Sequence, residues 1–415
     1  MEKYNEHKET NVFWQTMMPK HWCVMKLRYI LRKLQREKKP NAELLVCSNS
    51  GRVNIKGDNK LGLVAEDDKI YQGVGKGDLL IHGMDTWHGA IAVSEYDGMC
   101  TPVVHVCDST QNKSFVAYYL RNMAYEKVFK LISNGVRQNT SDFRCWDKLA
   151  VVPIILPPLA EQNSIVSYLD TKCSQLDTLL SNKEKEISLL QEMKQRVIAD
   201  AVTRGINPSV KFKTTNIPWL PEIPEHWEER KMKYIFKERS EKNHPNEEPL
   251  CATQSKGVIP QSLYDGRVVV VNKGFENLKF VKEGDFVISL RSFQGGIEYA
   301  YYQGIISAAY TILEIVEFTM ASYYRLMFKS HNFIQLLQTC VTGIREGQNI
   351  NYPLLSNKIL PVPTLSEQRA IVSYITERTS KIDTLIEKLT KEIECVKEYK
   401  QRLISDVVTG QVKVC

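Results

Sequence analysis

The stretch LAEQNSIVSYLDTKCSQLDTLLSNKEKEISLLQEMKQRVIADAVT occupies residues 159–203, and LSEQRAIVSYITERTSKIDTLIEKLTKEIECVKEYKQRLISDVVT occupies residues 365–409. The second stretch follows the first by 206 residues (365 − 159), and about half of the aligned positions are identical. Long repeated segments mark repeated structural units. The sequence therefore predicts two copies of one unit, each a mixed segment followed by a long helix.

A second repeat lies upstream of each long segment, at an offset of 205 residues. It aligns Trp14, Pro19, His21 and Trp22 with Trp219, Pro224, His226 and Trp227. The residues between the repeated parts differ strongly between the two copies. A shared frame with two dissimilar inserts indicates one mechanical task performed on two different targets.

Apolar residues recur every four and three positions along both long segments, which predicts coiled-coil helices. The first seam is Leu169, Cys173, Leu176, Leu180, Lys183, Ile187, Leu190, Lys194, Val197 and Ala201. The second seam is Ile375, Thr379, Ile382, Ile386, Leu389, Ile393, Val396, Lys400, Leu403 and Val407. Each helix should be roughly 60 Å long. Because like units usually close around a twofold axis, we expect the two helices to pack antiparallel.

The fold class predicted is α+β, with an internal pseudo-twofold repeat. The expected segments are a first mixed domain at 1–156, a first helix at 157–206, a second mixed domain at 207–360 and a second helix at 361–415. Both mixed segments contain short runs of alternating apolar residues separated by glycines, which are typical of strands and turns.

Composition places the chain among ordinary globular proteins, with 43% hydrophobic and 25% charged residues. No apolar run is long enough to cross a membrane, and the first residues lack the apolar core of a signal peptide, so we expect a cytoplasmic protein. The ten cysteines contain no Cys-x-x-Cys pair, which predicts buried free thiols rather than metal ligands or disulfides. The formal net charge of +7 is compatible with a nucleic-acid partner.

The chain resembles the specificity subunit of type I restriction–modification systems over its full length. The motifs that carry the resemblance open the two helices, at Pro157–Gln162 and Pro363–Gln368, and open the two mixed domains, at Pro19–Trp22 and Pro224–Trp227. Further matching stretches are Met84–Gly98, Leu290–Gly304, Gly135–Gln138 and Gly343–Gln348.

The resemblance implies a non-catalytic DNA-reading protein with two target-recognition domains, each reading one half of a split target. It further implies that the helix pair fixes the gap between the halves and recruits two adenine-N6 methyltransferase subunits and, in the full complex, endonuclease subunits. No cofactor is expected in this chain. S-adenosylmethionine, ATP and Mg²⁺ are expected on the partner subunits.

Loop residues with forked donors and acceptors are the candidates for reading base edges in double-stranded DNA. In the first domain they are Asp85, Trp87, His88, Arg137, Gln138 and Asn139. In the second they are Arg291, Ser292, Gln294, Arg345, Gln348 and Asn349. For any one of them an ordinary polar turn remains an alternative, and Trp87 could belong to a core.

Basic residues follow each His-Trp pair and are candidates for phosphate contacts. The first group is Lys26, Arg28, Arg32, Lys33, Arg36, Lys38 and Lys39. The second is Arg230, Lys231, Lys233, Lys237, Arg239 and Lys242. A solvated charged surface is the alternative for both groups.

Apolar residues outside the seams predict contacts with partner subunits. The candidates are Ile165, Tyr168 and Leu179 on the first helix and Ile371, Tyr374 and Leu385 on the second. Because the two sets are equivalent, they would suit two identical partners.

Three other functions stay open at this point. A stand-alone DNA-binding protein would lack enzymatic partners, and a coiled-coil scaffold would lack affinity for DNA. An enzyme would need a catalytic motif, and the chain contains neither a Walker A loop nor His-Glu-x-x-His nor Gly-x-Ser-x-Gly. A catalytic group assembled from distant residues leaves the third possibility open.

An antiparallel pair of helices has a geometric consequence for a DNA-reading protein. The two unlike domains would meet opposite strands, so the target should be split and asymmetric. Helices of this length would separate half-sites by about one to two turns of DNA.

Overall fold

A computed structural model describes residues 2–57, 70–133, 143–217, 219–266, 274–316, 320–342 and 349–414. The chain divides into two compact units. Unit 1 contains Met1–Lys183 and Lys391–Cys415, and unit 2 contains Glu184–Thr390. Each unit thus holds one mixed domain and part of both long helices, whereas the expected division gave each helix a segment of its own.

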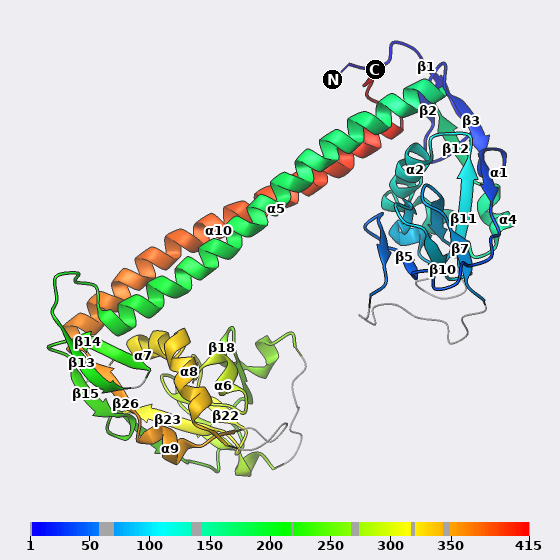
Figure 1. Ribbon diagram of the computed structural model, residues 1–415. Helices are drawn as coiled ribbons and strands as arrows, with labels where there is room; N and C mark the ends of the chain where they lie inside the picture. The colour runs from blue at the N-terminus through cyan, green and yellow to red at the C-terminus, as the bar shows by residue number, and fades with distance from the viewer. Residues whose placement is uncertain are drawn as a thin grey trace. The chain divides into compact units, whose positions relative to one another are not determined.

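The two mixed domains contain corresponding elements in the same order (Figure 1). Those of unit 1 are β1 (His7–Glu9), β2 (Met17–Pro19), β3 (Cys23–Lys26), α1 (Leu27–Ile30), β4 (Leu31–Lys33), β5 (Leu45–Cys47), β6 (Val53–Ile55), β7 (Gln72–Val74), β8 (Leu79–His82), η2 (Thr86–His88), β9 (Ile91–Val93), β10 (Gly98–Cys100), β11 (Val104–Ser109), α2 (Lys113–Tyr125), α3 (Val128–Ile132), α4 (Trp146–Ala150) and β12 (Pro153–Leu156).

The elements of the unit 2 domain follow the same order, with a few additional short elements. They are β13 (Phe212–Ile217), β14 (Leu220–Pro224), β15 (Glu228–Lys231), η3 (Met232–Tyr234), β16 (Phe236–Arg239), β17 (Leu250–Thr253), β18 (Gly257–Pro260), η4 (Gln261–Leu263), η5 (Phe275–Asn277), β19 (Lys279–Val281), β20 (Phe286–Ile288), α6 (Ser292–Gly295), β21 (Glu298–Tyr299), β22 (Gly304–Ile306), β23 (Thr311–Ile315), α7 (Ala321–Met327), α8 (His331–Thr339), β24 (Val341–Thr342), β25 (Asn349–Ile350), α9 (Tyr352–Ser356) and β26 (Ile359–Val362).

A four-stranded antiparallel sheet forms the centre of each domain. Its strand order is β4-β11-β8-β9 in unit 1 and β16-β23-β20-β21 in unit 2. The register also repeats, because Leu80 pairs with Ala92 in unit 1 and Val287 pairs with Glu298 in unit 2. The prediction of two α+β domains built on one plan is therefore confirmed.

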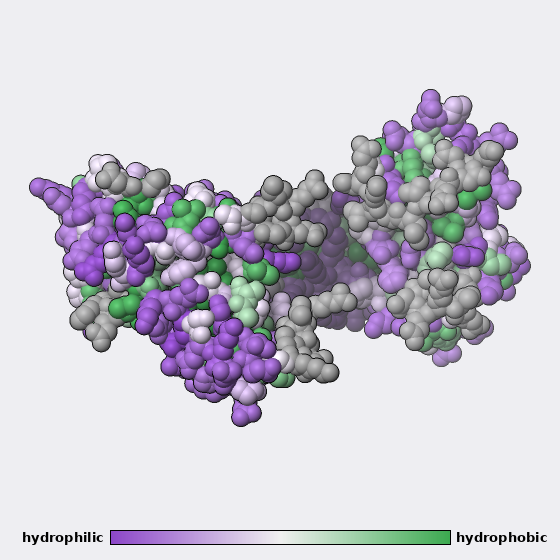
Figure 2. Space-filling view, turned by 90° about the horizontal axis from the view of Figure 1, so that it is seen from below, coloured by the Kyte–Doolittle hydropathy of each residue, from purple (hydrophilic) through white to green (hydrophobic). Residues whose placement is uncertain are grey.

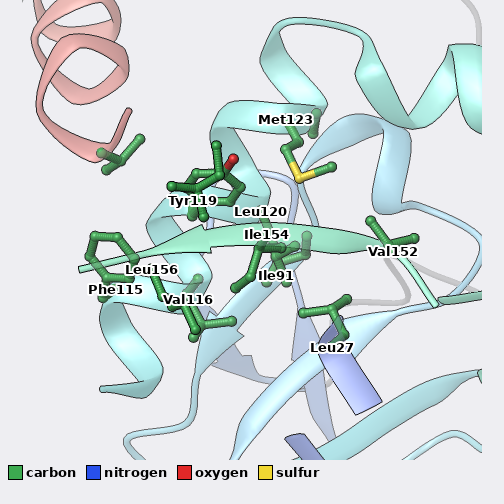
Figure 3. Close-up of a cluster of buried hydrophobic side chains, with 14 of the residues drawn as sticks. Leu27, Ile91, Phe115, Val116, Tyr119, Leu120, Met123, Val152, Ile154 and Leu156 are labelled. Atoms are coloured by element: carbon green, nitrogen blue, oxygen red, sulfur yellow. The ribbon is translucent and has the colours of Figure 1, made fainter. Parts of the chain in front are cut away.

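The core of the unit 1 domain lies where helix α2 packs on the strands (Figure 3). Phe115, Tyr119 and Met123 of α2 meet Ile154 of β12 and Ile91 of β9, and all five are almost fully buried. A core of this size removes several large apolar side chains from water, each contributing about 1.5–3 kcal/mol. Hydrophilic residues cover most of the face that Figure 2 shows.

The long helices are α5 (Leu159–Arg204) and α10 (Leu365–Val408). In unit 1 the Lys400 Nζ donates to Asp177 at 2.5 Å, and Lys183 pairs with Glu392. In unit 2 the Lys194 Nζ donates to Asp383 at 2.6 Å. Residue numbers rise along one helix as they fall along the other, so the predicted antiparallel pairing is confirmed.

The predicted seams are the inner faces of this pair. Every seam residue is buried or half-buried, from Leu169 and Cys173 at one end of α5 to Ala201 at the other. Three seam positions, Lys183, Lys194 and Lys400, are lysines whose ammonium groups reach carboxylates of the opposite helix. Polar seam residues of this kind fix the register of a helix pair.

Buried glutamines hold the first turn of each long helix in place. The Gln162 Oε1 accepts the Asn112 N–H at 3.0 Å, and its Nε2 donates to the Pro157 carbonyl at 2.9 Å. Gln368 makes the same two bonds at 2.9 Å, to Met320 and Pro363. The repeated Glu-Gln motif is therefore structural.

The glutamate of the same motif contacts the upstream His-Trp motif. His21 Nε2 lies 2.8 Å from a Glu161 oxygen, and His226 Nε2 lies 2.9 Å from a Glu367 oxygen. The Glu-Gln motif and the His-Trp motif thus contact each other in both units. Together they fasten each long helix to its domain.

Among the described residues, no helix combines the length and apolar character that crossing a membrane requires. The described cysteines are free thiols, and Cys47, Cys100, Cys107, Cys173 and Cys340 are buried. Cys23, Cys145 and Cys395 are exposed, against the expectation that the free thiols are buried, because they lie on outer faces of a strand, a loop and a helix.

Candidate nucleic-acid interface

In each domain a hairpin turn lies against the loop that follows one inner strand of the central sheet, β8 in unit 1 and β20 in unit 2. In unit 1 the β5–β6 turn lies beside the loop after β8. A Cβ added to Gly89 of this loop would lie 3.9 Å from the carbonyl oxygen of Asn49 in the turn. In unit 2 an added Cβ on Gly295 would be 2.7 Å from the Gln254 side chain of the β17–β18 turn. The two domains therefore present the same pair of loops with different residues.

The turns themselves require glycine. Gly51 and Gly257 have φ angles of +74° and +75°, a left-handed conformation that other residues adopt at a cost. Glycine at this position lets each hairpin reverse within a few residues, which brings polar turn residues close to the neighbouring loop.

The predicted residues of the unit 1 loop have different roles. His88 is exposed, and Asp85 is partly exposed and precedes the short helix η2. The Asp85 N–H donates to His82 Nδ1 at 3.1 Å, and burial lowers the pKa of His82, which favours the neutral ring as acceptor. Trp87 packs against the domain core. Asp85 and His88 therefore remain the accessible polar groups of this loop.

The unit 2 loop requires one correction. Arg291 and Gln294 are exposed at the two ends of helix α6, as a base-reading role requires. Ser292 is only 1% exposed, and its hydroxyl accepts the Ser289 N–H at 2.8 Å. The prediction of DNA contact is wrong for Ser292, since its side chain closes the turn after β20 instead of facing solvent.

The second pair of predicted loops lies mostly outside the described residues. This applies to Arg137, Gln138, Asn139, Arg345 and Gln348.

Asn349 is the described member of that set. It is exposed on strand β25, which packs beside helix α6. The structure thus brings Asn349 close to helix α6, which carries Gln294 and follows Arg291. More than fifty residues separate Asn349 from this helix in sequence.

Two members of the predicted basic groups are structural. Arg36 pairs with Asp78, which is 6% exposed. The equivalent Arg239 donates to Asp285 at 3.0 Å and to Glu314 at 2.5 Å. Arg36 follows strand β4 and Arg239 ends strand β16, and each pairs with the aspartate of the turn before β8 or β20, so its charge is used within the domain. The other members of the groups stay candidates for phosphate contact.

Sequence reasoning missed the hairpin turns as candidate DNA contacts. Their exposed polar residues are Asn49, Ser50 and Arg52 in unit 1 and Gln254, Ser255 and Lys256 in unit 2. The signal was present as Asn-Ser-Gly and Ser-Lys-Gly, because polar residues before glycine between two short apolar runs indicate a hairpin.

The predicted partner contacts on the helices fall into three groups. Ile165 and Ile371 are 0% exposed within the domain cores, which corrects their prediction, because the first turns of each helix pack on a domain. Tyr168 and Tyr374 are partly buried at the edges of those cores.

Leu179 and Leu385 are 41% and 48% exposed and stay candidates for partner contact. They lie farther along the helices, where no described part of either domain covers their side chains.

In chemical terms, each loop pair offers hydrogen-bond donors and acceptors on a rigid sheet. Unit 1 offers a carboxylate and an imidazole, and unit 2 offers a guanidinium and an amide. Guanidinium groups suit guanine and amides suit adenine in the major groove. Within the described residues there is no cluster of three or more side chains that could hold a metal ion.

A family model described as the type I restriction modification DNA specificity domain matches residues 224–395. That range covers most of the unit 2 domain and the greater part of α10, and unit 1 repeats the same sheet order and helix anchors. The chain is therefore similar to the specificity subunits of type I restriction–modification systems. The matched domain is described as a DNA specificity domain, so the similarity favours a role in DNA sequence recognition.

Known specificity subunits are similar over much of this chain. The putative type I restriction enzyme MjaX specificity subunit of Methanocaldococcus jannaschii is 25% identical over 368 residues, covering 87% of this chain and 77% of that protein. The MjaVIII specificity subunit of the same organism is 28% identical over 281 residues, covering 63% of each protein.

The fold of this chain also matches solved structures. One chain, from a study of complex assembly and conformational transition of the type I R-M system, has a TM-score of 0.67 at 16% identity. The match covers 95% of this chain and 99% of that chain. At this identity the likeness concerns the fold.

Proposed function

We propose that this chain is a specificity subunit that reads a bipartite, asymmetric sequence in double-stranded DNA, one half with each domain. The observation that carries the proposal is the repetition of one scaffold with different loops. Sheet order, helix anchors and Arg–Asp pairs repeat between the units, whereas the candidate reading residues change from Asp85 and His88 to Arg291 and Gln294.

The helix pair would set the gap between the half-sites. Its register is fixed by three Lys–carboxylate pairs, two of which are equivalent: Asp177–Lys400 and Asp383–Lys194 are related by the repeat of 206 residues (177 + 206 = 383; 194 + 206 = 400). A fixed register keeps the gap constant, and the rotation of DNA by about a tenth of a turn per base pair makes that gap critical.

We further propose that two copies of an adenine-N6 methyltransferase subunit bind the helix pair, and that endonuclease subunits join the full complex. Exposed apolar side chains support this. Leu179 and Tyr399 in unit 1 are 41% and 51% exposed, and Leu385 and Met193 in unit 2 are 48% and 56% exposed.

These four residues share one position relative to the seam. Each immediately precedes a seam residue, and such positions lie on the same edge of an antiparallel pair. The ion pairs place Leu179 at the level of Tyr399 and Met193 at the level of Leu385. Each unit thus carries an equivalent apolar patch, and two equivalent patches suit two copies of one partner.

In this proposal the chain performs no chemistry itself. S-adenosylmethionine would bind to the methyltransferase subunits, and ATP and Mg²⁺ would bind to the endonuclease subunits. The complex would act in the cytoplasm, where double-stranded DNA is available, without a membrane contact.

Methylome sequencing of a host that carries the chain with its methyltransferase subunit tests the reading function. We expect a split motif with N6-methyladenine in each half and a constant gap. Methylation within one continuous motif, or none that depends on the chain, would contradict the proposal.

Paired substitutions test the docking surface. Leu179→Asp together with Leu385→Asp should abolish co-purification of the methyltransferase subunit, because two charges would enter an apolar contact. Lys185→Asp, at an exposed position on the outer face of α5, is the matched control and should leave co-purification intact. If the wild type, the double variant and the control all bound the methyltransferase subunit equally, the docking surface would have to lie elsewhere.

A further inference from the structure

A lysine beneath the reading loop of unit 2 connects three separate segments. The Lys329 Nζ donates to both Glu298 oxygens at 2.7 Å, to the Gly295 carbonyl at 2.8 Å and to the Gln254 carbonyl at 3.3 Å. Gly295 ends helix α6, and Gln254 belongs to the β17–β18 turn. One ammonium group therefore joins the loop and the turn that form the candidate interface.

Glu298 is the counterion of this lysine and is 1% exposed. Strands β18 and β20 pack against β21, and neither these strands nor helix α6, which precedes β21 in the chain, carries an ionisable side chain. Arg325 of helix α7 lies over the Tyr299 ring instead. Lys329 is thus the charged group that faces Glu298 among the described residues.

Burial in these surroundings raises the pKa of Glu298 to about 7, since one lysine only partly offsets the loss of water around the carboxylate. When Glu298 takes up a proton, Lys329 keeps its charge but loses its counterion. The ammonium group, whose side chain is 30% exposed, then gains from moving toward water and away from the two carbonyls.

Unit 1 connects the same two segments without a carboxylate. Ala92 occupies the place of Glu298 in the sheet register. Arg121 of helix α2 donates to the Ser50 carbonyl of the β5–β6 turn at 3.0 Å and also lies 3.9 Å from a Cβ built on Gly89 in the loop. A guanidinium stays charged at any physiological pH. The two domains therefore hold their loops by different chemistry.

We propose that Lys329 and Glu298 are positioning residues for DNA recognition, and that their ion pair holds helix α6 against the β17–β18 turn so that unit 2 reads its half-site. This inference rests on the proposed function of the α6 loop. It makes reading of one half-site, the one assigned to unit 2, dependent on an internal ion pair that the other domain lacks.

The test is a selection of bound sequences from a pool of random DNA duplexes by the purified full chain at pH 8 and pH 6. With the wild-type chain, we expect the preference for one half of the enriched motif to fall on the order of tenfold at pH 6, since the charged fraction of a carboxyl group with a pKa of about 7 falls about tenfold between pH 8 and pH 6. The unit 1 loop contains histidines of its own, so the other half is not the control.

Variants supply the control. Glu298→Gln keeps the size of the side chain and an acceptor for Lys329 but cannot titrate, so the affected half should become independent of pH. Lys329→Met should weaken preference in the same half already at pH 8, and Lys329→Arg should restore most of it. Thermal unfolding of each variant identifies any that fail to fold, and the pH profile of the wild type stays decisive if one does.

Each outcome bears on a different statement. A wild-type motif whose two halves keep their preferences at both pH values, or a Glu298→Gln profile that matches the wild type, overturns the role of the ion pair while leaving DNA recognition intact. Absence of any enriched motif at either pH contradicts the proposed function itself.

Discussion

Replacement of Gln368 by leucine should destabilise unit 2, because the glutamine satisfies two buried backbone groups. The side chain is 0% exposed, and it accepts the Met320 N–H and donates to the Pro363 carbonyl, both at 2.9 Å. An unsatisfied buried group costs about 1–3 kcal/mol. Leucine leaves two such groups, and its own apolar burial offsets part of the cost, so we expect a loss of about 3 kcal/mol in the free energy of unfolding.

A graded series makes the reasoning testable. Gln368→Glu keeps an acceptor for Met320 but loses the donor to Pro363, and its charge must also be buried, so it should be destabilising as well. Arg369→Ala, at the next and exposed position, is the matched control and should stay within about 0.5 kcal/mol of the wild type.

Urea unfolding followed by tryptophan fluorescence measures the change, with hydrogen exchange at the start of α10 to assign it to unit 2. Gln162→Leu should produce at least as large a loss in unit 1, where the glutamine makes the two equivalent bonds and also donates to Gln111 at 2.7 Å. If Gln368→Leu and Arg369→Ala shifted the unfolding midpoint equally, the glutamine would not anchor the helix, and the structural explanation of the repeated motif would fail.

Three further results are expected. Burial raises the folded-state pKa of Glu298 from 4.5 to about 7, so between these pH values the native state binds a proton that the unfolded state has lost. The stability of unit 2 should therefore fall by roughly 3 kcal/mol as pH rises from about 4.5 to 7. Glu298→Gln should flatten that curve in denaturation measurements. A half chain of residues 1–206 should form a symmetric dimer, because Asp177 and Lys194 of one copy can replace Asp383 and Lys400 for the other. Sedimentation should show this dimer. A Lys194→Glu half chain that dimerises equally well would contradict the pairing. Insertion of one heptad into both α5 and α10 at facing positions should lengthen the gap of the methylated motif and spare both half-sites, whereas a change in the half-sites with a constant gap would refute the role of the helices.

Features that depend on local periodicity could be predicted from the sequence. The seams, the two long helices and their proline-flanked starts follow from residue spacing, and the internal repeat indicated two domains of one plan. The antiparallel direction was also predicted, but from symmetry; the Lys–carboxylate pairs across the helices are what fix it.

The sequence could not distinguish inward-facing from outward-facing polar groups within a loop or a basic run. Ser292 looked like a base contact and closes a turn, while Arg36 and Arg239 looked like phosphate contacts and pair with buried aspartates. The partners of these groups come from strands far away in sequence, so their orientation is decided by tertiary packing.

The sequence by itself determined that this protein consists of two related units on a heptad frame, because helix and strand periodicity are local properties of the chain. Only the tertiary structure decided which residues remain exposed at the candidate interface and that Glu298 and Lys329 meet beneath it. Thirty-one residues separate these two groups in sequence (329 − 298), and the fold alone removes them from water together.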